Sequence, residues 1–309
     1  MKNYLLLCGG VGGAKLALGF SKIIPASNLT ILVNTGDDFE HLNLKVCPDL
    51  DTVIYTLAGL ADLSKGWGRA DETWQALKSL GELGAETWFQ LGDQDIATHL
   101  RRTHLISKGA TLTEAIQDIT ANLKIDTNVL PMSDDLVETL IHTEHEVLAF
   151  QEYFVKFQCQ PKIKEFSFKG IESAALNPAL DLNAFDEIII CPSNPYVSIN
   201  PIIQLKELNN YLVTNASKVS VVSPIVDSES LKGPTSKMMK ELDVPVTVET
   251  IASFYANLAS KIFIDPADLP FQTAIETKGF SVFVAPLVMN SLDSKIALAN
   301  EILDNLERS

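Results

Sequence analysis

The sequence predicts an α/β fold in which helices cover a parallel β-sheet, and three observations support this prediction. A strand, a glycine-rich loop, a helix and a second strand follow one another near the N-terminus. Short, continuous apolar runs, typical of strands buried on both faces of a parallel sheet, recur along the chain. Polar clusters directly follow several of these runs, as is common where the strands of such a sheet end.

The N-terminal unit begins with an apolar run, Tyr4–Cys8, that stops at a glycine. Apolar residues at helical spacing predict a helix over Lys15–Ile24, and a β-rich run predicts a second strand over Leu29–Val33. A strand–helix–strand unit of roughly 30 residues with an apolar first strand is the usual opening of a parallel α/β sheet.

The middle of the chain shows little strand pattern from about residue 57 to residue 125, which predicts a mostly helical insertion. Helical patterns cover Asp95–Ile106 and the residues after Thr111, which forms a capping-box pattern with Glu114. Strand patterns then return at Val129–Met132, Glu146–Phe150, Lys164–Phe168, Ile188–Cys191, Val219–Ser223 and Phe280–Pro286. A last helix is expected over Leu292–Leu306. Since no repeat or Gly/Ser linker interrupts the chain, we expect a single domain over residues 1–309.

The composition limits the possible partners. Hydrophobic residues make up 46% of the chain and charged residues 20%, as in a globular protein with a substantial core. The formal net charge of −15 repels polyphosphate backbones and disfavours nucleic acid. No apolar run reaches the ~18–20 residues of a membrane span, and the four cysteines form no C-x-x-C pair. We therefore expect a cytoplasmic protein with no nucleic-acid and no membrane partner.

The loop between the first strand and the first helix is the first candidate for a phosphate-binding element. Glycines let the backbone approach a phosphate, and the N-terminus of the following helix offers free N–H groups. Its candidate residues are Gly9, Gly10, Gly12, Gly13 and Lys15. The loop departs from a dinucleotide fingerprint, which has a third glycine where Lys15 stands. A tight turn that needs glycine for packing alone is the alternative interpretation.

Polar clusters after four predicted strands are the second signal. In a parallel sheet these strand ends share one edge, where ligands bind at the reversal of strand order. The candidate binding residues in these clusters are Asn34, Asp134, Asp135, Ser193, Asn194, Pro195 and Ser223. Ordinary turn chemistry explains any one of the clusters equally well, but four on one edge indicate a site.

Paired carboxylates and a second glycine-containing segment complete the pattern. Asp37 and Asp38 are adjacent, and Asp49 lies two residues before Asp51. Carboxylate oxygens that meet a phosphorylated ligand commonly hold Mg²⁺, although a solvated loop or a helix cap explains each pair as well. The segment Gly233–Lys237 precedes a predicted helix and forms a plausible second phosphate cradle.

In chain order, these segments closely resemble the 2-phospho-L-lactate transferase family, which makes the coenzyme F-420 precursor from the deazaflavin Fo. The resemblance rests on CGGVGGAK at Cys8–Lys15, NTGDD at Asn34–Asp38, PDLDTV at Pro48–Val53, LGDQDIATH at Leu91–His99, LPMSDD at Leu130–Asp135, PSNP at Pro192–Pro195 and GPTSK at Gly233–Lys237. It implies a modified Rossmann-like sheet, a homodimer and a need for Mg²⁺. It also implies transfer of a phospholactyl-type group to the ribityl hydroxyl of Fo, with release of GMP. The acid of the donor is lactate, enolpyruvate or glycerate in different lineages.

Carried over motif by motif, the resemblance places the glycine loop and Ser193–Pro195 on the guanosine diphosphate side. Asp51 and Gln94 fall on the Fo side, although some relatives have a basic residue where Gln94 stands. Phosphoryl transfer needs alignment and neutralised charge. We therefore expect Mg²⁺ among Asp37, Asp38 and Asp51, with one of these aspartates as a base. Lys15 and Lys237 are expected to lie on the phosphates.

Two other function classes compete with this interpretation. A nucleotide-sugar-binding regulatory protein of the gluconeogenesis-factor type has a similar glycine loop, but is expected to lack the Leu91–His99 and Leu130–Asp135 segments. A nicotinamide-dependent oxidoreductase fits the Rossmann-like start, yet the sequence shows no hydride-transfer site and lacks the third glycine.

Overall fold

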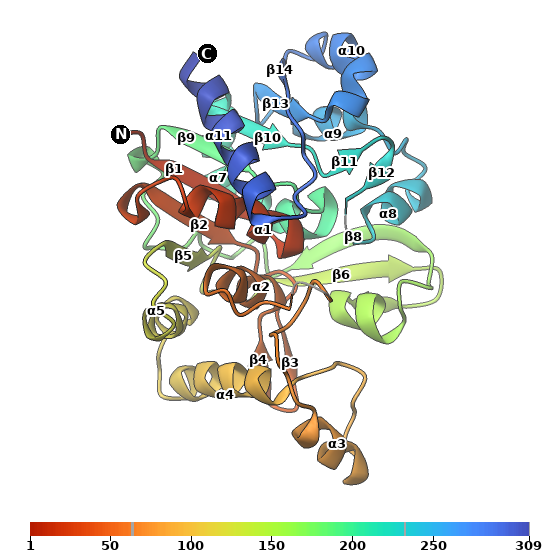
Figure 1. The fold of residues 1–309 in the computed structure, drawn as a ribbon. Coiled ribbons are helices and arrows are strands. Elements are labelled where there is room, and N and C mark those ends of the chain that lie inside the picture. Colours follow the sequence, from red (N-terminus) through yellow and green to blue (C-terminus); the bar gives the residue numbers. More distant parts are fainter. Residues whose placement is uncertain (63–64, 232, 309) are drawn as a thin grey trace.

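A seven-stranded, wholly parallel sheet forms the centre of the computed structural model, which describes residues 1–62, 65–231 and 233–308 (Figure 1). Its strands in spatial order are β14 (Ser281–Val284), β13 (Lys261–Ile264), β10 (Val219–Val222), β9 (Glu187–Ile190), β1 (Tyr4–Cys8), β2 (Leu29–Val33) and β5 (Asn128–Pro131). The chain builds outward from β1 in both directions, and Leu6 of β1 pairs with Ile31 of β2 and with Ile189 of β9. The predicted α/β class and parallel sheet are confirmed, and the strand order reverses between β1 and β9.

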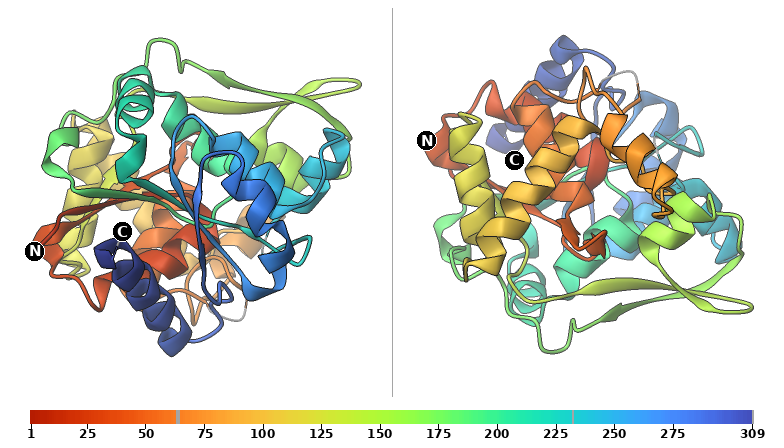
Figure 2. Two further views of the ribbon diagram at one scale, coloured as in Figure 1. Left: turned by 90° about the horizontal axis from the view of Figure 1, so that it is seen from above. Right: turned by 90° about the horizontal axis from the view of Figure 1, so that it is seen from below.

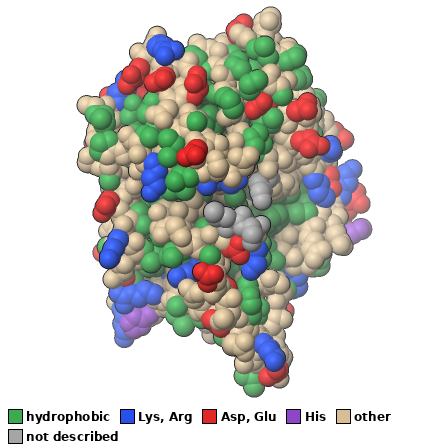
Figure 3. Space-filling model, viewed as in Figure 1, with side chains coloured by type: hydrophobic (Ala, Val, Ile, Leu, Met, Phe, Trp, Pro, Cys, Tyr) green, Lys and Arg blue, Asp and Glu red, His purple; other side chains and the backbone are tan. Residues whose placement is uncertain are grey.

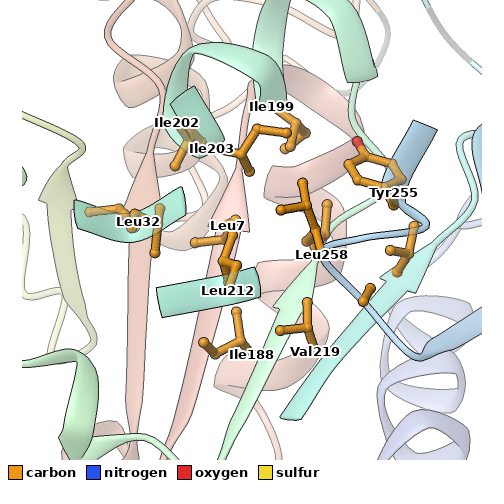
Figure 4. Packing of buried hydrophobic residues seen from close by; sticks show 14 of the residues in the cluster. Leu7, Leu32, Ile188, Ile199, Ile202, Ile203, Leu212, Val219, Tyr255 and Leu258 are labelled. Carbon is orange, nitrogen blue, oxygen red and sulfur yellow. The ribbon is translucent and has the colours of Figure 1, made fainter. Parts of the chain in front are cut away.

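Both faces of the sheet are buried, which explains why its strands are continuous apolar runs rather than alternating ones. Leu5 and Leu7 point into a cluster covered by α6 (Asn200–Gln204), α7 (Lys206–Thr214) and α9 (Val248–Tyr255), shown in Figure 4. Tyr4, Leu6 and Cys8 point to the opposite face. That face is covered by α1 (Gly10–Ser21), α2 (Pro48–Leu57), α5 (Leu112–Asn122) and α11 (Leu292–Arg308) (Figure 2).

Two smaller units extend from the sheet. The hairpin β3 (Phe39–His41) and β4 (Leu44–Val46) projects with α3 (Gln75–Glu82) and α4 (Asp93–Ser107) toward the bottom of Figure 1. A three-stranded antiparallel sheet consists of β7 (Val147–Ala149), β6 (Glu138–Thr143) and β8 (Ile163–Lys169), and a π-helix follows β7 over Glu152–Lys156. The short pair β11 (Ile225–Val226) and β12 (Glu229–Ser230) precedes α8 (Thr235–Glu241), and α10 (Gln272–Glu276) precedes β14.

Several elements differ from the prediction for local reasons. Helix α1 begins at Gly10 rather than at Lys15, because the glycines themselves form its first turn. The runs predicted around residues 146–150 and 164–168 pair with β6 in the small antiparallel sheet and not with the central sheet. The capping box is confirmed, since the Glu114 N–H donates to Thr111 Oγ1 at 3.2 Å and the Thr111 N–H donates to Glu114 Oε2 at 2.9 Å.

The surface in Figure 3 carries Lys and Arg side chains interspersed with Asp and Glu. No helix in the described part of the chain combines the length and apolar character that a membrane crossing needs.

Candidate active site

A cavity of about 710 Å³ opens where β1 and β9 end, on the two sides of the reversal in strand order. This is the position at which open parallel sheets bind their ligands. Gly9–Gly12 contribute from the loop after β1, and Pro192–Asn194 contribute from the loop after β9. Lys15 also lines the cavity, one turn into α1. The strand order therefore brings together two loops that are 180 residues apart in the sequence.

The two loops are joined by hydrogen bonds and by close backbone packing. The Gly9 N–H donates to Ser193 Oγ at 3.1 Å, and Ser193 Oγ donates to the Gly9 carbonyl at 2.5 Å. A Cβ atom on Gly12 would lie 2.0 Å from the Pro192 carbonyl oxygen, so this glycine is required by packing between the loops. Gly10 is different: it has φ +57° and opens α1, and the first turn of this helix lines the cavity.

Two buried carboxylates lie against this loop. Asp37 and Asp49 both line the cavity, and Asp49 Oδ1 is 3.2 Å from the position of a Cβ on Gly10. Burial raises the pKa of Asp49 to about 7, although hydrogen bonds from Asn34 and the Gly10 backbone favour its ionised form. Burial and the neighbouring charge of Asp49 raise the pKa of Asp37 well above its usual value. Because burial favours their neutral forms, the two carboxyls ionise together only when a positive charge lies nearby.

The other two aspartates of these motifs already have cationic partners. Asp38 Oδ2 lies 3.2 Å from Lys45 Nζ, and Asp51 accepts hydrogen bonds from the fully buried guanidinium of Arg102. Neither Asp38 nor Asp51 lines the cavity. Of the three aspartates expected to hold Mg²⁺, only Asp37 lines the cavity. The second carboxylate in the cavity lining is that of Asp49.

Asp49 lines the cavity, whereas Asp51, which the sequence pattern assigned to Mg²⁺, does not. Residues two apart on a helix face in different directions, so only one carboxylate of the Pro48–Asp51 turn can face the cavity. Arg102 in α4 distinguishes Asp49 from Asp51, because its guanidinium donates to the Asp51 carboxylate. This pairing spans 51 residues and is not visible in the local sequence.

The remaining predicted binding residues divide into two groups. Ser193, Asn194 and Gly233 line the cavity, and Asn194 also caps the π-helix that begins at Pro195. The others do not line the cavity; they are Gly13, Asn34, Asp134, Asp135, Pro195, Ser223, Gln94 and Lys237.

The contacts of this second group hold loops and helices in place. Asp134 accepts from the Thr113 N–H at 2.7 Å, and Asp135 accepts from the Ala175 N–H at 2.8 Å. Ser223 Oγ accepts from the Ile225 N–H at 3.0 Å and donates to the Ile225 carbonyl at 2.9 Å.

Lys237 and Gln94 are also bonded within the protein. Lys237 Nζ lies 2.5 Å from Glu241 Oε1 and donates to Tyr153 Oη at 3.2 Å. Gln94 accepts from Arg69 at 3.1 Å and donates to the Asp71 carbonyl at 2.9 Å.

Five aromatic side chains also line the cavity. We call them the aromatic wall, and they are Trp67, Trp88, Phe89, Phe150 and Phe154. The rings of Phe150 and Phe154 are nearly parallel, with centroids 5.5 Å apart, and Trp88 meets Phe89 edge to face at 5.8 Å. These residues come from three separate segments, and no local sequence pattern indicates that they meet. Such a surface suits a flat conjugated ring.

We call a second part of the lining the glycine wall, and it consists of Gly9–Gly12, Asp37, Asp49 and Ser193. Among the described residues, no group of three or more His, Cys, Asp or Glu is arranged to hold a metal ion. Asp37 Oδ1 is nevertheless buried without a hydrogen-bond partner, and Asp49 lies next to the loop that would receive a phosphate. Two carboxylates fit Mg²⁺ that takes its other ligands from phosphates and water.

Comparison with known proteins decides the family. The family model described as 2-phospho-L-lactate transferase CofD matches residues 5–273. The chain belongs to the 2-phospho-L-lactate transferase family. It is 34% identical to a phosphoenolpyruvate transferase of Streptomyces griseus subsp. griseus over 98% of each chain. It is also 34% identical to a 2-phospho-L-lactate transferase of Methanococcoides burtonii, over 97% of this chain and 98% of the relative.

This 2-phospho-L-lactate transferase family member is therefore a transferase, and its class of reaction is phospholactyl-type transfer in coenzyme F-420 biosynthesis. A solved structure of a UPF0052 family member from Bacillus halodurans is similar in fold, with a TM-score of 0.60 and 15% identity over 92% of each chain. The two relatives are named for different groups, phosphoenolpyruvate and 2-phospho-L-lactate, at the same 34% identity, so overall similarity does not select the group.

Proposed function

We propose that this family member transfers a phospho-three-carbon-acid group from a guanosine diphosphate-linked donor to the ribityl hydroxyl of the deazaflavin Fo, releasing GMP. The observation that carries the proposal is one cavity with two unlike walls, set at the reversal of strand order. The glycine wall suits a diphosphate, and the aromatic wall suits a conjugated tricyclic ring.

The donor's diphosphate is proposed to lie on the N-terminus of α1, between Gly10 and the Ser193 loop. Backbone N–H groups and the helix dipole favour an anion there. Lys15 and Lys65 are the cations among the described residues that line the cavity. Together they do not balance a diphosphate next to Asp37 and Asp49.

Asp37 and Asp49 are proposed to hold Mg²⁺ at this position. When bound, Mg²⁺ supplies the positive charge that neutralises the diphosphate and turns the two carboxylates from a repulsive surface into ligands. Asp38 and Asp51, which the sequence also offered, serve in this proposal to fix the surrounding loops through Lys45 and Arg102.

The chemistry requires one substitution at phosphorus. The oxygen of the ribityl hydroxyl forms a bond to the phosphorus that carries the acid, and the bond from that phosphorus to the GMP oxygen breaks. Asp37 and Asp49 line the cavity, so a carboxylate oxygen of either residue that does not bind Mg²⁺ would accept the proton of the attacking hydroxyl. No covalent intermediate with the protein is needed.

The test is mass spectrometry of the products formed from Fo, Mg²⁺ and each of the three donors, which carry phospholactate, phosphoenolpyruvate or phosphoglycerate. We expect Fo to gain one phospho-acid unit and GMP to appear in equal amount with at least one donor. Binding of the nucleotide without turnover of any donor would instead support the regulatory-protein alternative. The family resemblance also leads us to propose a cytoplasmic homodimer, which light scattering can check for its subunit number.

A further inference from the structure

A fully buried amide follows β2 and bonds to a residue that lines the cavity. Asn34 has no exposed surface, and its side chain joins three segments that come together at the cavity. Asn34 Nδ2 donates to Asp49 Oδ2 at 3.0 Å and to the Val197 carbonyl at 3.4 Å. Its Oδ1 accepts from the Gly36 N–H at 2.8 Å. One amide thus fixes the start of α2, the turn after β2 and the helical turn after β9.

The position of this amide matters because the two carboxylates beside it repel each other. Asn34 bonds Asp49 directly, and through the Gly36 N–H it holds the turn that carries Asp37. A buried pair of like charges normally escapes repulsion by binding a proton or by moving apart. A neutral N–H donor holds such a pair in place without adding a charge that would compete with a cation.

We infer that Asn34 is a positioning residue that keeps Asp37 and Asp49 close together and oriented for a divalent cation. The inference rests on the proposed function, which assigns these two carboxylates to Mg²⁺. Asn34 itself is not assigned to the cation, because its amide nitrogen faces Asp49 and Val197 and its oxygen is occupied by the Gly36 N–H. Loss of a residue that orients metal ligands typically lowers metal affinity by about 10- to 100-fold.

The chain offers a matched control in Asn177, which is also buried and also bridges a strand end. Asn177 Nδ2 donates to the Pro131 carbonyl at 2.8 Å and to Thr113 Oγ1 at 2.7 Å. Through Pro131 it contacts the end of β5, and it does not line the cavity. Substitution at Asn177 therefore removes a comparable set of hydrogen bonds without touching the two carboxylates.

The first experiment measures Mn²⁺ binding by electron paramagnetic resonance, with Mn²⁺ alone as the probe. We expect Asn34→Ala to weaken Mn²⁺ binding by about 10- to 100-fold and Asn177→Ala to leave it unchanged. A folded Asn34→Ala protein with wild-type affinity would overturn the role of Asn34. If the wild-type protein binds no Mn²⁺, both the role of Asn34 and the assignment of Asp37 and Asp49 to a divalent cation are wrong. Product formation by that wild-type protein would still uphold the transfer reaction.

The second experiment uses Asn34→Asp, which keeps the size and the acceptor for the Gly36 N–H but replaces the N–H donor by a third carboxylate. We expect a lower Tm without metal and a larger rise in Tm on adding Mg²⁺ than the wild type shows, because the cation replaces the lost donor. Asn177→Asp should lose stability without this gain. An equal Mg²⁺-induced rise for Asn34→Asp and wild type would contradict the inference, and so would an equal rise for the two variants.

Discussion

The two walls of the cavity are built in opposite ways. The glycine wall is made of backbone and short side chains packed so tightly that a Cβ on Gly12 would meet the Pro192 carbonyl at 2.0 Å. The aromatic wall is made of large side chains on segments outside the central sheet, and Trp67 and Phe154 are well exposed. The tight packing of the glycine wall holds its charged groups in fixed positions, whereas the exposed side chains of the aromatic wall can change conformation when a ligand binds.

This contrast separates chemistry from recognition. Groups that act on a reacting phosphorus must be held rigidly, because small displacements cost much of the rate. A surface that receives a flat ring needs area and polarisable faces more than exact position. We therefore expect substitutions in the glycine wall and its supports to affect turnover or stability, and substitutions in the aromatic wall to affect acceptor affinity.

The largest expected effect is on stability and comes from the support behind the glycine wall. Asp51→Asn should lower the free energy of unfolding by about 3–5 kcal/mol, because it leaves the buried Arg102 guanidinium without its anionic partner. Urea denaturation measures this loss. Asp118→Asn is the matched control, since it breaks the neighbouring but exposed pair with Arg101 and should change little. Equal losses for the two variants would remove the buried pair as a structural support.

The next effect is on turnover and comes from the glycine wall itself. Asp49→Asn keeps the shape of the side chain but removes its charge, so turnover should fall by roughly two orders of magnitude or more. Circular dichroism should show the same fold as the wild type. Steady-state release of GMP measures the change. A fully active Asp49→Asn enzyme would take this carboxylate out of the reaction and reopen the choice between Asp49 and Asp51.

A smaller effect is expected from the aromatic wall. Phe154→Ala removes one ring of a parallel pair and should weaken Fo binding by about tenfold, within the usual range for loss of one stacked aromatic. The apparent affinity for the donor should not change. Phe157→Ala is the control, because Phe157 is also partly exposed but does not line the cavity. Fluorescence titration with Fo measures the affinity of both variants. Equal losses of affinity for Phe154→Ala and Phe157→Ala would show that the Fo ring does not bind against Phe154.

The last of these predictions concerns the pH dependence of stability in the metal-free protein. The pKa of Asp49 is raised to about 7 in the folded chain from 3.8 in an exposed carboxyl, so the folded state holds this proton more tightly than the unfolded state. Asp49 therefore destabilises the fold progressively as pH rises from about 4 to 7. In excess chelator, Asp49→Asn should gain stability relative to wild type between pH 5 and pH 8. A constant difference over this range would show that Asp49 titrates normally.

The central sheet and the position of the site could be predicted because their signals are local. The apolar runs of β1 and β2 agree with the structure at both ends, since strands buried on both faces contain little else. The glycine loop and the Ser193 cluster were assigned to one edge by the general geometry of parallel sheets.

The parts that escaped prediction depend on long-range contacts. The choice between Asp49 and Asp51 depends on Arg102, and the aromatic wall combines Trp67, Trp88 and Phe150 from separate segments. Strand β13 is only four residues long and begins with Lys261, so its apolar run was too short to stand out. In each case the tertiary structure, and not the local pattern, selects which residues meet.

The central claim is that the glycine wall works on its substrate through a divalent cation held by Asp37 and Asp49, and its most direct test is GMP release measured against free Mg²⁺. With Fo and the active donor present, the wild-type enzyme should show no turnover in excess chelator and should recover fully as Mg²⁺ is restored. Asp49→Asn should need more Mg²⁺ and remain far below the wild-type rate at saturation. Full wild-type turnover in excess chelator would contradict the account.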